Sequence, residues 1–189
     1  LKAMNKTICL LLLLLLNNIV SAQQATVLKS YSATDLYEDY DLLVNALKEA
    51  HPGLYWYTSR ADFEQLFAEG RVSIKADMNT YDFYKIVAKI VSADKEGHST
   101  VYSAPDIGAF VNSGARYLPF AVKTCGEQLH LVHDLGPVKA MGHVITHIND
   151  KPVDTLIQEI FAHTSRYSDG FSVTGKYKDL DHFGFSGLY

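Results

Sequence analysis

The sequence contains little cysteine: among its 189 residues only Cys9 and Cys125 carry a thiol. Cys9 falls in an amino-terminal segment that we expect to be removed, so Cys125 would remain alone and no internal disulfide could form. An apolar core must therefore stabilise the fold, and a hydrophobic content of 48% allows one. Cys9 also stands at the start of the apolar run and not after it, which argues against a lipoprotein anchor.

The chain also lacks any cluster of basic residues. Its formal net charge is -4, and loss of Lys2 and Lys6 with the amino-terminal segment would make it -6. Nucleic-acid binding depends on concentrated positive charge, so this composition argues against nucleic acid as a partner. No amphipathic Lys/Arg-rich stretch is present either, which argues against attachment to a membrane surface.

Long apolar runs are absent as well. Lys2 and Lys6 precede an apolar run at residues 8–16, Asn17 and Asn18 interrupt it, and Val20-Ser21-Ala22 follows with small residues. A membrane-spanning helix needs about 18 or more apolar residues, which this run does not reach. The pattern is typical of a secretory signal peptide. We expect cleavage after residue 22 and export to the periplasm or the extracellular space.

Neither a metal-binding motif nor a nucleophile motif is complete. His130 and His133 would point to opposite faces of a strand, and no H-E-x-x-H is present, so we expect no metal and no cofactor. Gly184-Phe185-Ser186-Gly187 lacks the spacing of G-x-S-x-G and the strand-turn-helix pattern around it. We expect this stretch to be a loop.

Residues 23–112 have the pattern of a helical domain. Ser32 or Thr34 can cap a first helix, and His51-Pro52-Gly53 ends it. Ser59 can open a second helix and Thr80 a third. The apolar positions of the first helix share one face: Leu36, Tyr40, Leu43 and Leu47.

The pattern changes at about residue 113. Residues 117–124, 128–134 and 143–149 alternate like strands, Cys125-Gly126-Glu127 suits a hairpin turn, and helical spacing returns from Val153. We therefore predict an α+β chain, with a helical domain at 23–112 and a small β-rich module at 113–165. Residues 166–189 show little periodicity, and we expect them to begin a further domain and to be poorly packed.

The stretch from Gly142 to Val153 resembles the G-x-x-I-x-x-I-N-G-x-x-V signature of PDZ domains, with Asp150 where the family usually has glycine. Such a module binds an extended peptide by adding it as a strand to a sheet edge. Leu118, Pro119 and Phe120 are the candidate substrate-binding residues, as a loop that would hold the terminal carboxylate. An ordinary strand start is the alternative interpretation of the same residues.

Several short motifs occur in an order that resembles the front of tail-specific, or C-terminal processing, serine peptidases of the tricorn-protease-like branch. The motifs are His51-Pro52-x-Leu54-Tyr55, Thr80-x-x-Phe83-Tyr84, Asp94-x-x-Gly97-His98-Ser99, Leu118-Pro119, the PDZ-like stretch and Ser168-Asp169-Gly170-Phe171.

The resemblance implies a serine hydrolase that engages polypeptide ends without a cofactor. Its nucleophilic serine and oxyanion-hole amides would lie in an α/β catalytic domain after the PDZ-like module, absent from this chain, so the chain itself should be inactive. In the tricorn-like branch His98 would assist that serine as a base. In the branch that uses lysine, His98 would be structural. A non-catalytic exported protein that binds a peptide or another ligand with the same modules is the alternative function.

Overall fold

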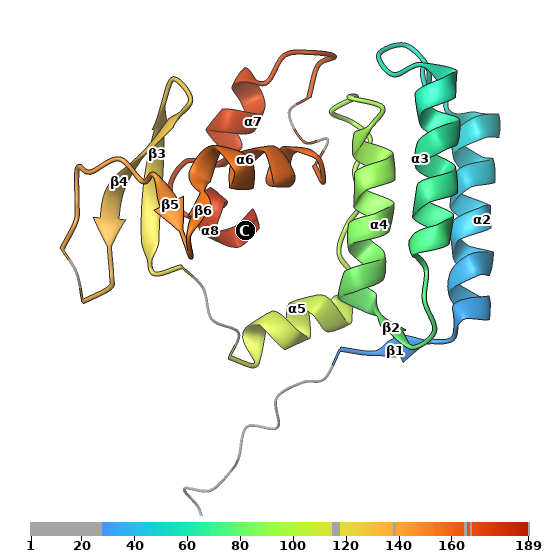
Figure 1. Cartoon of the computed structure of the whole chain (residues 1–189), viewed down its shortest axis with the longest axis horizontal. Coiled ribbons are helices and arrows are strands. Elements are labelled where there is room, and N and C mark those ends of the chain that lie inside the picture. Colours follow the sequence, from blue (N-terminus) through green and yellow to red (C-terminus); the bar gives the residue numbers. More distant parts are fainter. Residues whose placement is uncertain (1–27, 115–117, 138, 165, 167, 189) are drawn as a thin grey trace, which may run out of the picture.

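The computed structural model describes residues 28–114, 118–137, 139–164, 166 and 168–188. The predicted signal peptide at residues 1–22 lies outside these ranges. The described chain contains seven helices and three two-stranded antiparallel sheets, which makes it an α+β protein (Figure 1). None of its described helices combines the length and the apolar character that crossing a bilayer requires.

Three helices stand side by side in the first half: α2 (Ala33–Ala50), α3 (Arg60–Ser73) and α4 (Thr80–Ser92). The side chains of Ser32, Ser59 and Asn79 cap them by accepting a bond from the backbone N–H three residues later, which satisfies a donor that has no partner inside a helix. The strands β1 (Ser30–Tyr31) and β2 (Met78–Asn79) pair beneath them, and α5 (Pro105–Asn112) follows α4.

The core of this half contains the predicted first-helix residues Leu36 and Tyr40. The Tyr40 hydroxyl is buried and donates to the Phe67 carbonyl at 2.7 Å, so α2 and α3 share a satisfied polar contact inside an apolar core. The other buried members are Leu54, Phe63, Phe67, Ile74 and Ile90.

The second half is built on a hairpin of β3 (Phe120–Cys125) and β4 (Gln128–Asp134). Gly126 has a φ of +61° in the turn, which confirms the predicted hairpin connection. Residues 142–145 bond to the other edge of β4, and the short β5 (His147–Ile148) and β6 (Lys151–Pro152) lead into α6 (Val153–Phe161). Val122 and Leu129 of the hairpin pack with Ile157 and Ile160 of α6.

Residues 168–188 correct one expectation. They form α7 (Thr174–Asp179) and α8 (Gly184–Leu188), and both Leu180 and Phe185 are fully buried in the core against β3 and α6. The prediction of a poorly packed segment was therefore wrong, as was the loop predicted for residues 184–187. These helices are too short to show a 3.6-residue period, and contacts with residues distant in sequence bury them.

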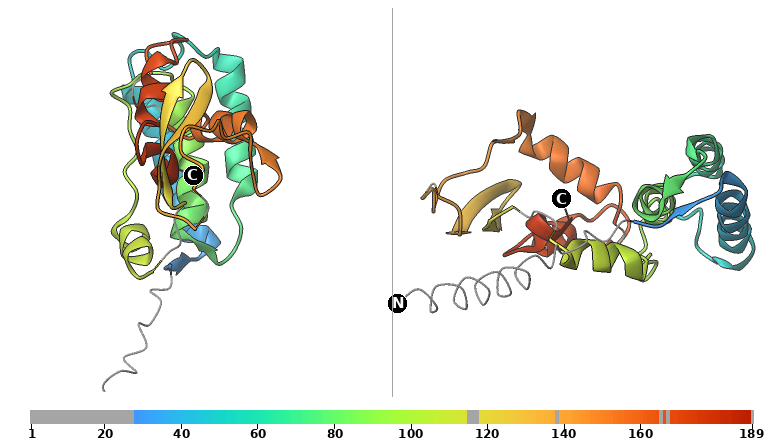
Figure 2. Two further views of the ribbon diagram at one scale, coloured as in Figure 1. Left: turned by 90° about the vertical axis from the view of Figure 1, so that its left-hand side faces the viewer. Right: turned by 90° about the horizontal axis from the view of Figure 1, so that it is seen from below.

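The two halves of the molecule touch through the segments that follow α4 and α6. The Ser92 hydroxyl donates to the Ala162 carbonyl at 2.5 Å, and the Gly170 N–H donates to the Lys95 carbonyl at 3.0 Å. In the view from below, α2 to α4 lie at one end, the hairpin at the other, and α5 to α8 between them (Figure 2).

Candidate functional site

Several of the sequence motifs meet at the segment after α4, which we call the motif loop (residues 94–103). Asp94 begins it and is 1% exposed. One carboxylate oxygen accepts the Glu96 N–H at 2.9 Å, which bends the chain immediately after the helix. Burial raises the pKa of Asp94, and hydrogen bonds from Ser99 and Glu96 together with the charge of His51 offset part of that rise.

His51 comes from the end of α2 and contacts the motif loop. Its Nδ1 accepts the Gly53 N–H at 3.2 Å, so in the neutral ring the proton sits on Nε2. This Nε2 lies 3.2 Å from Asp94 Oδ2 and 3.2 Å from the Ser99 hydroxyl. The structure thus joins two motifs that are far apart in the sequence.

The grouping of His51, Asp94 and Ser99 does not have the geometry of a catalytic triad. In a triad one ring nitrogen faces the carboxylate and the other faces the serine, so that the serine proton can pass to the ring. Here the same nitrogen faces both groups, and the other nitrogen is engaged by the backbone. The cluster therefore links the end of α2 to the motif loop, and its geometry differs from that of a catalytic triad.

His98, the candidate catalytic residue, projects from the motif loop into solvent, and its side chain is 96% exposed. Its Nδ1 lies 2.7 Å from a carboxylate oxygen of Glu96, and its backbone N–H donates to the other oxygen. The hydrogen bond to Glu96 raises the pKa of His98. The carboxylate orients the imidazole, but its role toward a serine stays a prediction.

The Ser168-Asp169-Gly170-Phe171 motif packs on the other side of the motif loop. Asp169 pairs with Glu96 as an antiparallel bridge, and the Lys95 ammonium lies 4.3 Å from the centre of the Phe171 ring. Gly170 has a φ of +59°, and a Cβ there would lie 2.6 Å from the Tyr57 ring, so only glycine fits.

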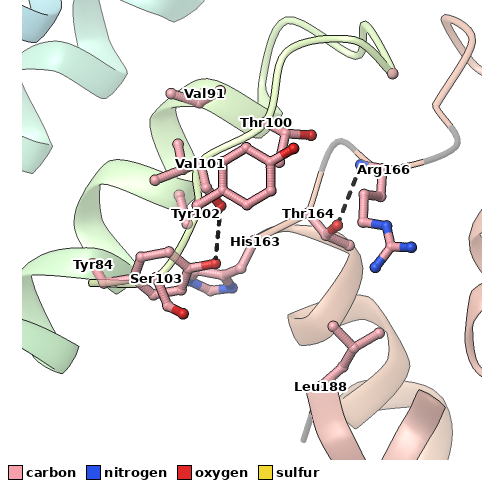
Figure 3. A pocket seen from close by; sticks show the side chains of 12 residues that line it. Tyr84, Val91, Thr100, Val101, Tyr102, Ser103, His163, Thr164, Arg166 and Leu188 are labelled. Atoms are coloured by element: carbon pink, nitrogen blue, oxygen red, sulfur yellow. Dashed lines mark hydrogen bonds between the residues drawn. The ribbon is translucent and has the colours of Figure 1, made fainter. Parts of the chain in front are cut away.

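Beside the motif loop lies a pocket of about 590 Å³, which we call the loop pocket (Figure 3). α4 and the motif loop form one wall, and the chain after α6 together with Leu188 of α8 forms the other. Its polar lining comes from Tyr84, Thr100, Tyr102, Ser103, His163, Thr164 and Arg166, and Ala88, Val91, Val101 and Leu188 add apolar surface.

The donors of the loop pocket suit a carboxylate or peptide carbonyl groups. Figure 3 shows the Arg166 guanidinium directed into the space between Thr164 and Leu188. Arg166 also faces the Asp179 carboxylate at 3.7 Å. His163 donates from Nδ1 to the Glu159 carbonyl at 2.7 Å, so its Nε2 is the acceptor of the neutral ring.

Pro119 and Phe120 line a different cavity, an apolar groove of about 380 Å³ at the open end of the hairpin. Leu131, Val144, Ile145 and Ile148 share this groove, and Leu118 packs against the nearby core. The groove suits an apolar side chain, whereas Asp134 in its lining would repel a carboxylate. The assignment of residues 118–120 to carboxylate binding stays a prediction.

Sequence reasoning missed Arg166, His163 and Tyr102 as members of the loop pocket. No short motif contains them, and the packing of the chain after α6 beside the motif loop brings them together. In the described part of the chain, no group of three or more His, Cys, Asp or Glu side chains is arranged to hold a metal ion.

Comparison with known proteins adds no relative: no protein-family profile matches this chain, and no curated protein or solved structure is significantly similar to it.

Proposed function

We propose that this chain is the amino-terminal, polypeptide-binding portion of an exported serine peptidase. A polypeptide tail would run along the module formed by β3, β4 and α6 and reach the loop pocket. The nucleophilic serine would come from residues outside the chain, and His98 is the candidate to assist it.

The observation that carries this proposal is the convergence of the motifs. His51, Tyr84 and residues 168–171 lie apart in the sequence, yet each of them contacts the motif loop, and the motif loop lines the loop pocket. Glycines and polar side chains that serve only local turns would not need to gather at one place. Their gathering beside a polar pocket supports a shared binding role.

The second half supports the polypeptide part of the proposal. A strand pair followed by a helix packed across it is the arrangement by which a PDZ-like module holds an extended peptide between strand and helix. β3 and α6 share a buried core that contains Val122 and Ile157, which supports the PDZ-like interpretation.

The geometry of the described residues favours a binding role over a catalytic role. Ser99 lies in a cluster where one imidazole nitrogen serves both the carboxylate and the hydroxyl, and no general base is oriented for it. This observation also suits the alternative function, a non-catalytic exported peptide-binding protein. The sequence encoded beyond Tyr189 distinguishes the two, because a serine in a strand-to-helix turn would favour the peptidase.

The proposal is tested by fluorescence anisotropy with labelled unstructured peptides that carry a free or an amidated carboxyl end. We expect the free end to bind at least tenfold tighter, because a charge-assisted bond to Arg166 contributes about 1.5–3 kcal/mol. Arg166→Gln should remove the preference for the free carboxyl end. Arg60→Gln is the control, because it removes the same charge from a residue that lies over the Tyr55 ring, and it should keep the preference.

Equal affinity for both peptide ends in the unmodified chain would contradict the proposal. A fluorophosphonate probe serves as the second measurement, because it labels activated serines covalently. We expect no labelling of this chain, and labelling at Ser99 would show that the cluster is catalytic after all.

A further inference from the structure

The outer edge of β3 is covered by the chain itself. Alternate residues of a strand direct their backbone groups to the same edge, which for β3 means Phe120, Val122 and Thr124. Val122 exchanges both backbone bonds with His182, at 2.7 and 2.6 Å. Without this cover, a strand of another polypeptide could pair with β3 at this edge.

Side chains complete the cover on either side of that central pair. The Thr124 N–H donates to the Asp181 carboxylate at 2.7 Å, and the Ser186 hydroxyl donates to the Phe120 carbonyl at 2.7 Å. Each of the three outward residues of β3 is thus bonded by residues 180–188, which we call the cover segment.

The cover segment also fills the space between β3 and α6. Leu180 and Phe185 are fully buried there, together with Val122 and Ile157. Asp181 is anchored to Lys123 by an ion pair, so the segment meets the strand with apolar, polar and charged contacts.

The course of the cover segment follows the outer edge of β3. It runs antiparallel to β3, from Asp181 beside Thr124 to Ser186 beside Phe120. Leu188 then lines the loop pocket (Figure 3). The segment therefore connects the strand edge to the pocket without a break.

We infer that the cover segment is an intramolecular occupant of the polypeptide-binding path, and that a bound polypeptide must displace it from β3. This inference rests on the proposed function. The partner is an extended polypeptide that runs antiparallel to β3, places apolar side chains where Leu180 and Phe185 now lie, and has an acidic group near Lys123.

The bonding of the segment shows why an extended chain can compete with it. Only His182 makes backbone bonds to β3 in both directions, and it does so at a φ of +59°, a conformation that is unfavourable for a non-glycine residue. The bonds at the two ends come from side chains. An extended peptide would offer backbone groups to all three outward residues of the strand.

The test uses a fluorescein-labelled peptide with the sequence of residues 180–188 as the probe and the full chain as its binder. His182→Pro should release the segment, because proline fixes φ near −65° and removes the N–H that Val122 accepts. We expect this variant to bind the probe at least about tenfold tighter than the unmodified chain, since release raises the fraction of binding-competent molecules. Phe183→Ala is the matched control, because this half-exposed residue lies in the same segment and its ring contacts His133 of β4 and not β3, and the variant should bind like the unmodified chain.

Hydrogen exchange of the unmodified chain gives a second measurement that does not depend on any variant. We expect the amides of His182 and Phe185 to exchange through a local opening that leaves Leu129 and Leu131 of β4 protected. Exchange of all four amides in one common opening would overturn the inference, as would equal probe binding by His182→Pro and the unmodified chain. Probe binding by His182→Pro, combined with no binding of free-carboxylate peptides by either protein, would support the occupant and contradict the proposed function alone.

Discussion

At the scale of single residues, Asp94 is a carboxylate almost wholly removed from water, and three different groups depend on it. The Glu96 N–H, the His51 ring and Ser99 all face it. Asp94→Ala would remove the carboxylate that accepts the Glu96 N–H and faces the His51 ring and Ser99 inside the protein. We expect the variant to lose about 2–4 kcal/mol in the free energy of unfolding, measured by urea denaturation.

His98→Ala is the control for that loss, because its side chain is exposed and holds no buried group in place. We expect its free energy of unfolding to stay within about 0.5 kcal/mol of the unmodified chain. A larger loss for His98→Ala than for Asp94→Ala would show that His98, and not Asp94, holds the motif loop.

The protonation of His98 gives a further prediction at this scale. Its hydrogen bond with Glu96 favours the charged ring, so its pKa should exceed the ordinary value of about 6.5 in an NMR titration. The contribution of the pair to stability is present at low pH and disappears as the pH rises through this raised pKa. Glu96→Gln should return the pKa toward the ordinary value; a His98 pKa that does not respond to this change would show that the contact is not maintained in solution.

The roles of single residues could be predicted from the sequence where they depend only on neighbouring residues in the chain. Ser32 and Ser59 cap their helices as expected, and Gly126 turns the hairpin, because each of these roles depends on neighbours within three or four positions. The contact of His51 with Asp94 depends on how α2 packs in the helical half, so the sequence could suggest each residue but not the pair.

At the scale of elements, Asp181 fastens the cover segment to β3. Burial alone would raise its pKa, but hydrogen bonds from Lys123 and from the Thr124 N–H and hydroxyl hold it at about 2. An aspartate lowered from 3.8 to about 2 stabilises the fold by about 2 kcal/mol at neutral pH.

Asp181→Asn should therefore destabilise the chain by about 2 kcal/mol at pH 7. The contribution is complete above the unfolded pKa and decreases as the pH falls toward the folded one. Urea denaturation of both proteins should show the difference reduced to about half at pH 3. A difference that is constant from pH 7 to pH 3 would show that the ionised carboxylate is not the anchor.

The turn between β5 and β6 has Asp150 at the position where the resemblance to PDZ domains leads us to expect glycine. Asn149 and Asp150 both have positive φ, at 49° and 63°, as a two-residue hairpin turn requires. Asp150→Gly should leave the free energy of unfolding unchanged or raise it by up to about 1 kcal/mol. Asp150→Val should lower it by about 1–3 kcal/mol, because a β-branched residue resists this conformation. Equal free energies of unfolding for the two variants would argue that residue 150 does not adopt the positive φ of this turn.

At the scale of the whole molecule, the sequence predicted the change from helices to strands near residue 113 but not how the two parts meet. The strand and helix patterns depend on local alternation, whereas the loop pocket depends on the chain after α6 lying beside the motif loop. The packing of Leu180 and Phe185 likewise has no periodic signal, because two helices of five and six residues show too few turns.

The central claim is that one continuous path, from the edge of β3 to the loop pocket, receives a polypeptide tail. The most direct measurement is a two-dimensional amide NMR titration of the chain with an unstructured peptide that has a free carboxyl end. We predict that the amide signals of Thr100 to Ser103, of His163 to Arg166 and of Val122 shift together and saturate at one peptide concentration. Saturable shifts confined to other parts of the chain, or no shifts, would contradict this claim.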